Sequence, residues 1–150
     1  MTLFRSIAIP ILVFLIDRIS KVLVLWRLNW PGQSIDLYGP LSIYYIKNSG
    51  GAFGFFQNKG SLFSLLSAVL TTLVILSLVF MNFKSPLAKI GLLIMLGGAL
   101  GNLADRLLLG GVVDFIKFGR FPIFNLADVA IVSGAGCVIF ALLTSSSTSI

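Results

Sequence analysis

Long apolar segments constrain this chain more than any other feature of its sequence. Four of them can be drawn, over about residues 4–26, 61–81, 87–109 and 126–144. Each is close to the roughly 20 apolar residues that an α-helix needs to cross the hydrocarbon core of a bilayer. Because 57% of the 150 residues are hydrophobic and only 11% are charged, no large soluble domain fits beside them. The sequence predicts one integral-membrane domain over residues 1–150, an all-α membrane protein with four transmembrane helices.

The connections between the apolar segments differ in kind. The first segment passes directly into Asp17-Arg18 with no small-residue cleavage site, so we interpret it as a retained span and not as a removed signal. The connection over residues 27–60 carries Gly39-Pro40 and then an alternating, aromatic-rich run, which predicts two short strands around a turn. We expect a small β-sheet lying on the membrane surface. The polar turn at residues 82–86 predicts that spans two and three form an antiparallel hairpin.

Charge restricts the partners but leaves the orientation open. The formal net charge is +6, yet the Lys and Arg residues are scattered singly, so we expect contact with lipid headgroups and no binding of nucleic acid. Four spans place both termini on one side of the membrane. Counting basic residues in the loops favours one orientation, whereas their density per loop residue favours the other.

Missing residue types narrow the chemistry further. The chain has no His and a single Cys, and its five acidic residues are all Asp. A Ser-His-Asp or Cys-His site would therefore lack its base, and a zinc site would lack its usual ligands. We expect no metal and no cofactor. Cys137 lies inside an apolar run, where a lone Cys is usually a small packing residue.

The aspartates gather toward one end of the predicted bundle. In a four-span antiparallel arrangement Asp17, Asp105, Asp114 and Asp128 all lie toward the face opposite the termini, and Asp36 lies in the large loop on that face. An ionisable residue in or near a span is expensive unless it has a function or a partner. The clustering predicts one polar site.

Local spacing offers a structural explanation for several of these residues. Asp17 and Lys21 are spaced i,i+4 and could neutralise each other on one helix face, which spacing alone favours. Asn102 and Arg106 have the same spacing, and the Arg106 side chain could extend to the headgroups or orient a carboxylate. Asn125 followed by Asp128 is typical of a helix N-terminus, with Asn as the cap. Spacing therefore leaves structural and functional roles open.

A set of ordered motifs favours a functional role. They are Asp17-Arg18-x-x-Lys21, Asn48-x-Gly-x-Ala-Phe-Gly54, Gly97-Gly-Ala-Leu-Gly-Asn-Leu-Ala-Asp-Arg106, Val112-Val-Asp-Phe115 and Phe124-Asn-Leu-Ala-Asp128. With these motifs the chain resembles the lipoprotein signal peptidases (signal peptidase II) over nearly its whole length. Gly51 departs from the more usual Ala, and the stretch between the last two aspartates is shorter than expected, which affects only the outer loop.

The resemblance implies an aspartyl endopeptidase that removes signal peptides from diacylglyceryl-modified prolipoproteins, cutting on the amino side of the lipidated cysteine. It implies Asp114 and Asp128 as the catalytic dyad. It also implies supporting or substrate-binding positions, namely Asp17, Lys21, Asn48, Gly54, Asn102, Asp105, Arg106 and Asn125. The implied location is the bacterial cytoplasmic membrane, with the site and the sheet on the extracytoplasmic side and both termini in the cytoplasm.

Two competing hypotheses are weaker. A Ser-Lys peptidase would have to use Ser20-Lys21 or Ser49 with Lys47, but adjacent residues point about 100° apart on a helix. A small carrier or channel with buried charges would need an oligomer, since four short spans enclose little space. We expect a monomer whose partners are prolipoprotein substrates and membrane lipids.

Overall fold

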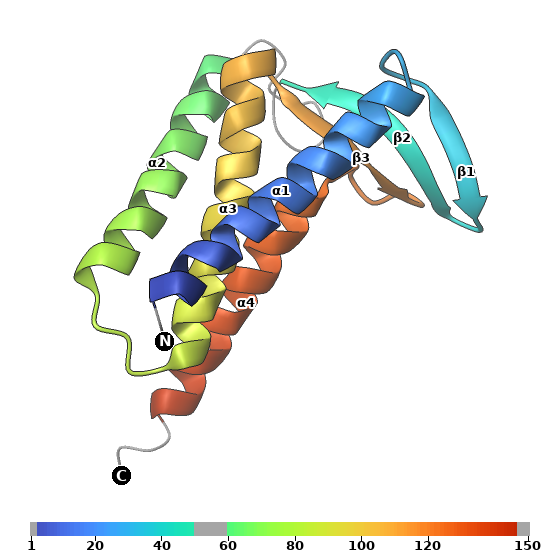
Figure 1. Ribbon diagram of the computed structural model, residues 1–150. Coiled ribbons are helices and arrows are strands. Elements are labelled where there is room, and N and C mark those ends of the chain that lie inside the picture. Colours follow the sequence, from blue (N-terminus) through green and yellow to red (C-terminus); the bar gives the residue numbers. More distant parts are fainter. Residues whose placement is uncertain (1–2, 50–59, 147–150) are drawn as a thin grey trace.

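The computed structural model describes residues 3–49 and 60–146. Four helices account for most of these residues and lie close to the predicted ranges (Figure 1). They are α1 (Leu3–Arg27), α2 (Gly60–Phe80), α3 (Pro86–Leu109) and α4 (Leu126–Ser146). The outer ends of α1 and α4 lie at one end of the bundle, and the sheet lies at the other (Figure 1). This is the arrangement that an even number of spans predicts.

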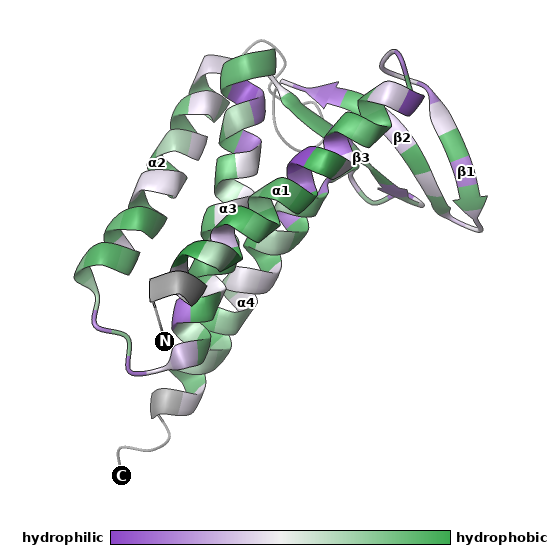
Figure 2. Ribbon diagram, viewed as in Figure 1, coloured by the Kyte–Doolittle hydropathy of each residue, from purple (hydrophilic) through white to green (hydrophobic). Residues whose placement is uncertain are grey.

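The apolar surface of the bundle faces outward. Within the described residues, α2, α3 and α4 are each long and apolar enough to cross a membrane. Helix α1 is as long but carries Asp17, Arg18 and Lys21, while its other faces expose large side chains such as Leu12 and Ile19. Apolar residues cover the helices along most of their length (Figure 2). The chain is a multi-pass membrane protein, and the predicted fold class is confirmed.

Helix α3 is the centre of the bundle, because it packs against each of the other three helices. Ser85 caps its start, with Pro86 in the first turn, and Gly110 ends it in the left-handed conformation at φ 71°. The approach of α4 is close enough that a Cβ at Gly98 would lie 2.5 Å from the Ala127 carbonyl oxygen. A larger residue there would force the helices apart.

A three-stranded antiparallel sheet extends from the end of the bundle opposite the termini (Figure 1). Its strands β1 (Ser34–Tyr38) and β2 (Leu41–Asn48) form the predicted hairpin, with Gly39 in the turn at φ 54°. The third strand, β3 (Val112–Phe118), was not predicted and pairs with β2. Because β3 connects α3 to α4, it brings the sheet against the end of the helical bundle.

A small hydrophobic core fixes the sheet to the last turns of α1. Its buried members are Val24 from α1, Leu28 directly after that helix, Tyr45 from β2, and Val113 and Phe115 from β3. Val113 and Phe115 flank Asp114 in the sequence. Burial of these two apolar neighbours therefore holds the backbone of Asp114 in one place.

Candidate active site

Asp114 lies on β3 at the junction of the sheet and the bundle, and only 3% of its surface is exposed. Both of its carboxylate oxygens accept hydrogen bonds from amide side chains. Asn125 Nδ2 donates to Oδ1 at 2.7 Å, and Asn48 Nδ2, from the end of β2, donates to Oδ2 at 2.8 Å. Three separate segments of the chain therefore meet at this one carboxylate.

Asp128 is placed by the start of α4. Asn125 and Asp128 form a reciprocal cap, in which the Asp128 backbone N–H donates to Asn125 Oδ1 at 2.9 Å and the Asn125 backbone N–H donates to Asp128 Oδ2 at 3.3 Å. Asn102 Nδ2 on α3 donates to Asp128 Oδ1 at 2.8 Å. The predicted helix cap is present, and it directs the Asp128 side chain toward Asn102, while the catalytic role of Asp128 stays a prediction.

Two asparagine amides join the two carboxylates. Asn125 contacts Asp114 through its side chain and Asp128 through its backbone, and its Nδ2 also donates to Asn102 Oδ1 at 3.1 Å. Lys21 Nζ donates to the same Asn102 oxygen at 3.2 Å. With two donors on its oxygen, the Asn102 amide can only present its nitrogen to Asp128.

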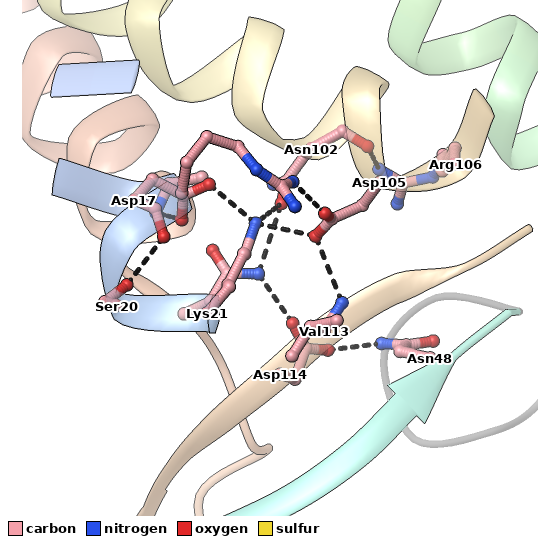
Figure 3. A network of polar contacts seen from close by, with 12 residues as sticks. Asp17, Ser20, Lys21, Asn48, Asn102, Asp105, Arg106, Val113 and Asp114 are labelled. Carbon is pink, nitrogen blue, oxygen red and sulfur yellow. Dashed lines mark hydrogen bonds and ion pairs between the residues drawn. The ribbon is translucent and has the colours of Figure 1, made fainter. Parts of the chain in front are cut away.

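A cluster of charged side chains lies next to Asn102, with Lys21 between Asp17 and Asp105 (Figure 3). Lys21 Nζ pairs with Asp17 Oδ2 at 2.7 Å and with Asp105 Oδ2 at 2.8 Å, and all three side chains are almost completely buried. Arg18 pairs with the other oxygen of Asp105. The predicted i,i+4 pair of Asp17 and Lys21 is present, but Lys21 also connects α1 to α3.

Backbone groups attach the same cluster to both carboxylate-bearing segments. Asp17 Oδ1 accepts the Ala127 backbone N–H at 3.0 Å, at the start of α4. Asp105 Oδ2 accepts the Val113 backbone N–H at 3.2 Å, directly before Asp114 on β3. Each of these buried aspartates therefore fixes the residue that precedes one of the paired carboxylates.

Burial changes the electrostatics of Asp114. The pKa of Asp114 is raised from 3.8 to about 6, chiefly by the loss of water around this side chain and also by the negative charge of Asp128, against the opposing hydrogen bonds from Asn48 and Asn125. A carboxyl group with this pKa can give up and take back a proton near neutral pH, as general acid-base chemistry requires.

The four other residues that the sequence analysis singled out have four different positions. Arg106 lies in the last turn of α3 and its Nη1 donates to the Asn102 backbone oxygen at 3.2 Å. Gly54 lies outside the described residues, so its predicted role stays a prediction. Asp36 is exposed on β1 and belongs to no contact of the cluster that is described above. Cys137 packs beside Gly91 at the α3–α4 interface, in agreement with a packing role.

Sequence reasoning missed one member of the cluster. Arg18 stood in the first motif, but only its neighbour Asp17 and Lys21 were singled out. Its spacing of i,i+3 to Lys21 places both cations on one side of α1, and this spacing could have identified Arg18 as a member of the cluster.

The chain is thus a multi-pass membrane protein with two carboxylates, linked through asparagine, at one end of its helical bundle. The family model described as Signal peptidase (SPase) II matches residues 9–144. The chain therefore belongs to the signal peptidase II family, whose members are lipoprotein signal peptidases of the aspartic type. The resemblance drawn from the motifs is confirmed.

Named relatives cover nearly the whole chain. It is 41% identical to the lipoprotein signal peptidase of Pelotomaculum thermopropionicum, over 99% of this chain and 96% of that protein. It is 44% identical to the lipoprotein signal peptidase of Syntrophomonas wolfei, over 89% of each chain. A bacterial membrane enzyme solved at 2.3 Å superposes with a TM-score of 0.86 at 28% identity, covering 99% of this chain and 93% of the other.

Proposed function

We propose that this lipoprotein signal peptidase cleaves its substrates with Asp114 and Asp128 as a water-activating dyad. The observation that carries the proposal is the linkage of the two carboxylates through Asn125, which touches both. Neighbouring carboxylates in a poorly solvated site do not both ionise readily, so they share a proton and titrate as a pair.

The shared proton supplies both acid and base. The ionised carboxylate of the pair takes a proton from a water molecule, whose oxygen then attacks the carbonyl carbon of the scissile peptide bond. The protonated carboxyl donates a hydrogen bond to the carbonyl oxygen as negative charge develops there. When the C–N bond breaks, a carboxyl of the pair protonates the leaving amine, so no covalent acyl-enzyme forms. Arg106, in the turn of α3 beside Asn102, adds positive charge near the pair.

The substrate is a prolipoprotein whose cysteine carries diacylglycerol, and the cut falls on the amino side of that cysteine. The position of the dyad suits such a substrate, because Asp128 lies in the first turn of a span and Asp114 in the adjoining sheet. The acyl chains can stay in the bilayer while the scissile bond reaches the membrane–water interface. The site is extracytoplasmic, both termini are cytoplasmic, and the chain acts as a monomeric single domain in the bacterial cytoplasmic membrane.

The competing Ser-Lys mechanism has little support from the contacts of Ser20 and Lys21. The Ser20 hydroxyl donates to the Asp17 backbone oxygen at 2.7 Å, whereas the Lys21 ammonium is buried between two carboxylates. A buried ammonium held by two anions cannot take a proton from a serine. Serine-directed reagents are therefore expected to leave the enzyme active.

The test is cleavage of a diacylglyceryl-modified lipobox peptide by purified enzyme, with the products identified by mass spectrometry. Asp114→Asn and Asp128→Asn should each abolish turnover, because Asn can hydrogen-bond but cannot exchange a proton. Asp36→Asn, which changes an exposed aspartate of β1, is the matched control and should cleave like the wild type. Turnover in either dyad variant at the control rate would exclude that residue from the reaction.

A further inference from the structure

Arg18 supplies the charge that balances the buried cluster. Asp17 and Asp105 carry two negative charges and share the one ammonium of Lys21, and these three side chains are almost completely inaccessible to water. Without another cation the cluster would hold an uncompensated negative charge, which is expensive in a buried site. Arg18 pairs with Asp105 Oδ1, and its side chain retains 20% exposure. Arg18 is therefore the charged member of this cluster that keeps contact with the solvent-accessible surface.

Asp105 transmits this contact in two directions. Its Oδ2 accepts the Val113 backbone N–H at 3.2 Å, one residue before Asp114. The same oxygen holds Lys21 Nζ at 2.8 Å, and Lys21 donates to Asn102, whose Nδ2 donates to Asp128 at 2.8 Å. An unbalanced Asp105 would draw Lys21 toward itself and loosen the hold on Asn102.

We propose that Arg18 is a positioning residue for the reaction: by pairing with Asp105 it lets that one carboxylate hold both the Val113 backbone and Lys21, and so fixes Asp114 and Asp128 relative to each other. This inference rests on the proposed dyad. Arg18 does not contact either dyad carboxylate in the described structure, so it acts through Asp105.

Charged groups surround Asp105 on three elements, and the strand β3, which contacts it through the Val113 N–H, carries Asp114. Helix α1 provides Arg18, Lys21 and Asp17, and α3 provides Arg106 one residue further on. Of these, Arg18 is the one whose ion pair with Asp105 uses the oxygen that is free of other described contacts. Removing Arg18 therefore takes the charge partner from Oδ1 of Asp105, and Oδ2 must then hold the Val113 N–H and Lys21 without that balance.

The experiment measures kcat and KM on the lipobox peptide for Arg18→Met, Arg18→Lys, Asp105→Asn and the double variant Arg18→Met with Asp105→Asn. Arg18→Met should lower kcat about tenfold with little change in KM, because geometry at the reacting groups is lost and not substrate affinity. Arg18→Lys keeps the charge and should recover most of the activity. In the Asp105→Asn background, Arg18→Met should cause almost no further loss, because the route through Asp105 is already absent.

Arg27→Met is the matched control, since it removes an exposed cation from the end of the same helix and should leave kcat unchanged. Thermal unfolding of each variant in detergent distinguishes a change in the geometry of the site from a loss of folding. If Arg18→Met alone unfolds, the double variant, whose cluster carries no net charge, can still be compared with Asp105→Asn. Equal losses from Arg18→Met in both backgrounds, a loss confined to KM, or wild-type activity of Arg18→Met would each overturn the inference. Full activity of Asp114→Asn would instead overturn the dyad.

Discussion

Replacing Asp114 by Asn should make the protein less sensitive to pH, and the size of the effect follows from burial. The pKa of Asp114 in the folded chain is about 6, against an ordinary value of 3.8, chiefly because burial penalises the ionised form. A difference of this size corresponds to about 3 kcal/mol of folding free energy. Since the folded state binds the proton more tightly than the unfolded state, this stabilisation is present below about pH 4 and is lost as the pH rises through about 6.

The measurement is the free energy of unfolding of wild type and Asp114→Asn in detergent micelles, from about pH 4 to about pH 7.5. The variant should gain about 3 kcal/mol relative to wild type over this range, because Asn carries no charge to bury. The amide introduced at this position also alters the hydrogen bonds from Asn48 and Asn125, but that change is independent of pH and shifts only the offset between the two curves. The slope of the difference therefore isolates the carboxyl group.

Asp36→Asn provides the matched control, because it removes an exposed carboxylate from the same sheet. Its unfolding curve should run parallel to that of the wild type across the range. A difference between wild type and Asp114→Asn that stays flat with pH, or that falls as the pH rises, would refute the reasoning about burial. A parallel loss of slope in Asp36→Asn would assign the effect to the sheet as a whole.

Two further predictions concern packing and orientation. Gly101→Ala should destabilise the protein by about 1–3 kcal/mol in thermal unfolding, because the new Cβ would collide with Asp17 Oδ2. Gly136→Ala, where a Cβ meets nothing within 4 Å, should be neutral or stabilising. Equal effects of the two substitutions would show that the α1–α3 contact is not tight. In intact cells of a cysteine-free background, an impermeant thiol reagent should label Arg120→Cys and spare Lys84→Cys, and the reverse pattern would place the site in the cytoplasm.

Hydropathy was sufficient to predict the helices because each apolar segment is close in length to the thickness of a bilayer, and most of their ends adjoin Gly, Pro or polar residues. The hairpin of β1 and β2 was predictable for the same kind of local reason, since a Gly-Pro turn separates its strands. These signals lie within a few residues of the element that they specify.

Strand β3 could not be predicted from such local signals. Its residues Val112–Phe118 form a short apolar run interrupted by Asp114 and Lys117, and periodicity alone does not separate a short buried strand from the end of a helix. What makes it a strand is pairing with β2, as in Ile46 opposite Asp114, between segments more than 60 residues apart. The same is true of Arg18, whose partner Asp105 lies 87 residues away.

The motifs located the candidate site well, yet spacing did not distinguish its roles. Asn125 and Asp128 satisfied a helix-cap pattern, and the structure uses that pattern to aim Asp128 at the other residues. Asp17 and Lys21 satisfied an ion-pair pattern, and the structure extends that pair to α3 and α4. A residue can therefore meet a local structural requirement and a distant one together.

The bond from the Ala127 backbone N–H to Asp17 Oδ1 joins positions 110 residues apart, near the two ends of the chain. A ribosome delivers α1 first and α4 last. Until α4 enters the bilayer, Asp17 has no backbone donor at this position, Asn102 lacks both Asn125 and Asp128, and Asp114 lacks one of its two amide partners. The contacts of the candidate site therefore form only when synthesis is nearly complete, and a nascent chain that stalls before residue 126 lacks Asp128 and the bond from Ala127 to Asp17.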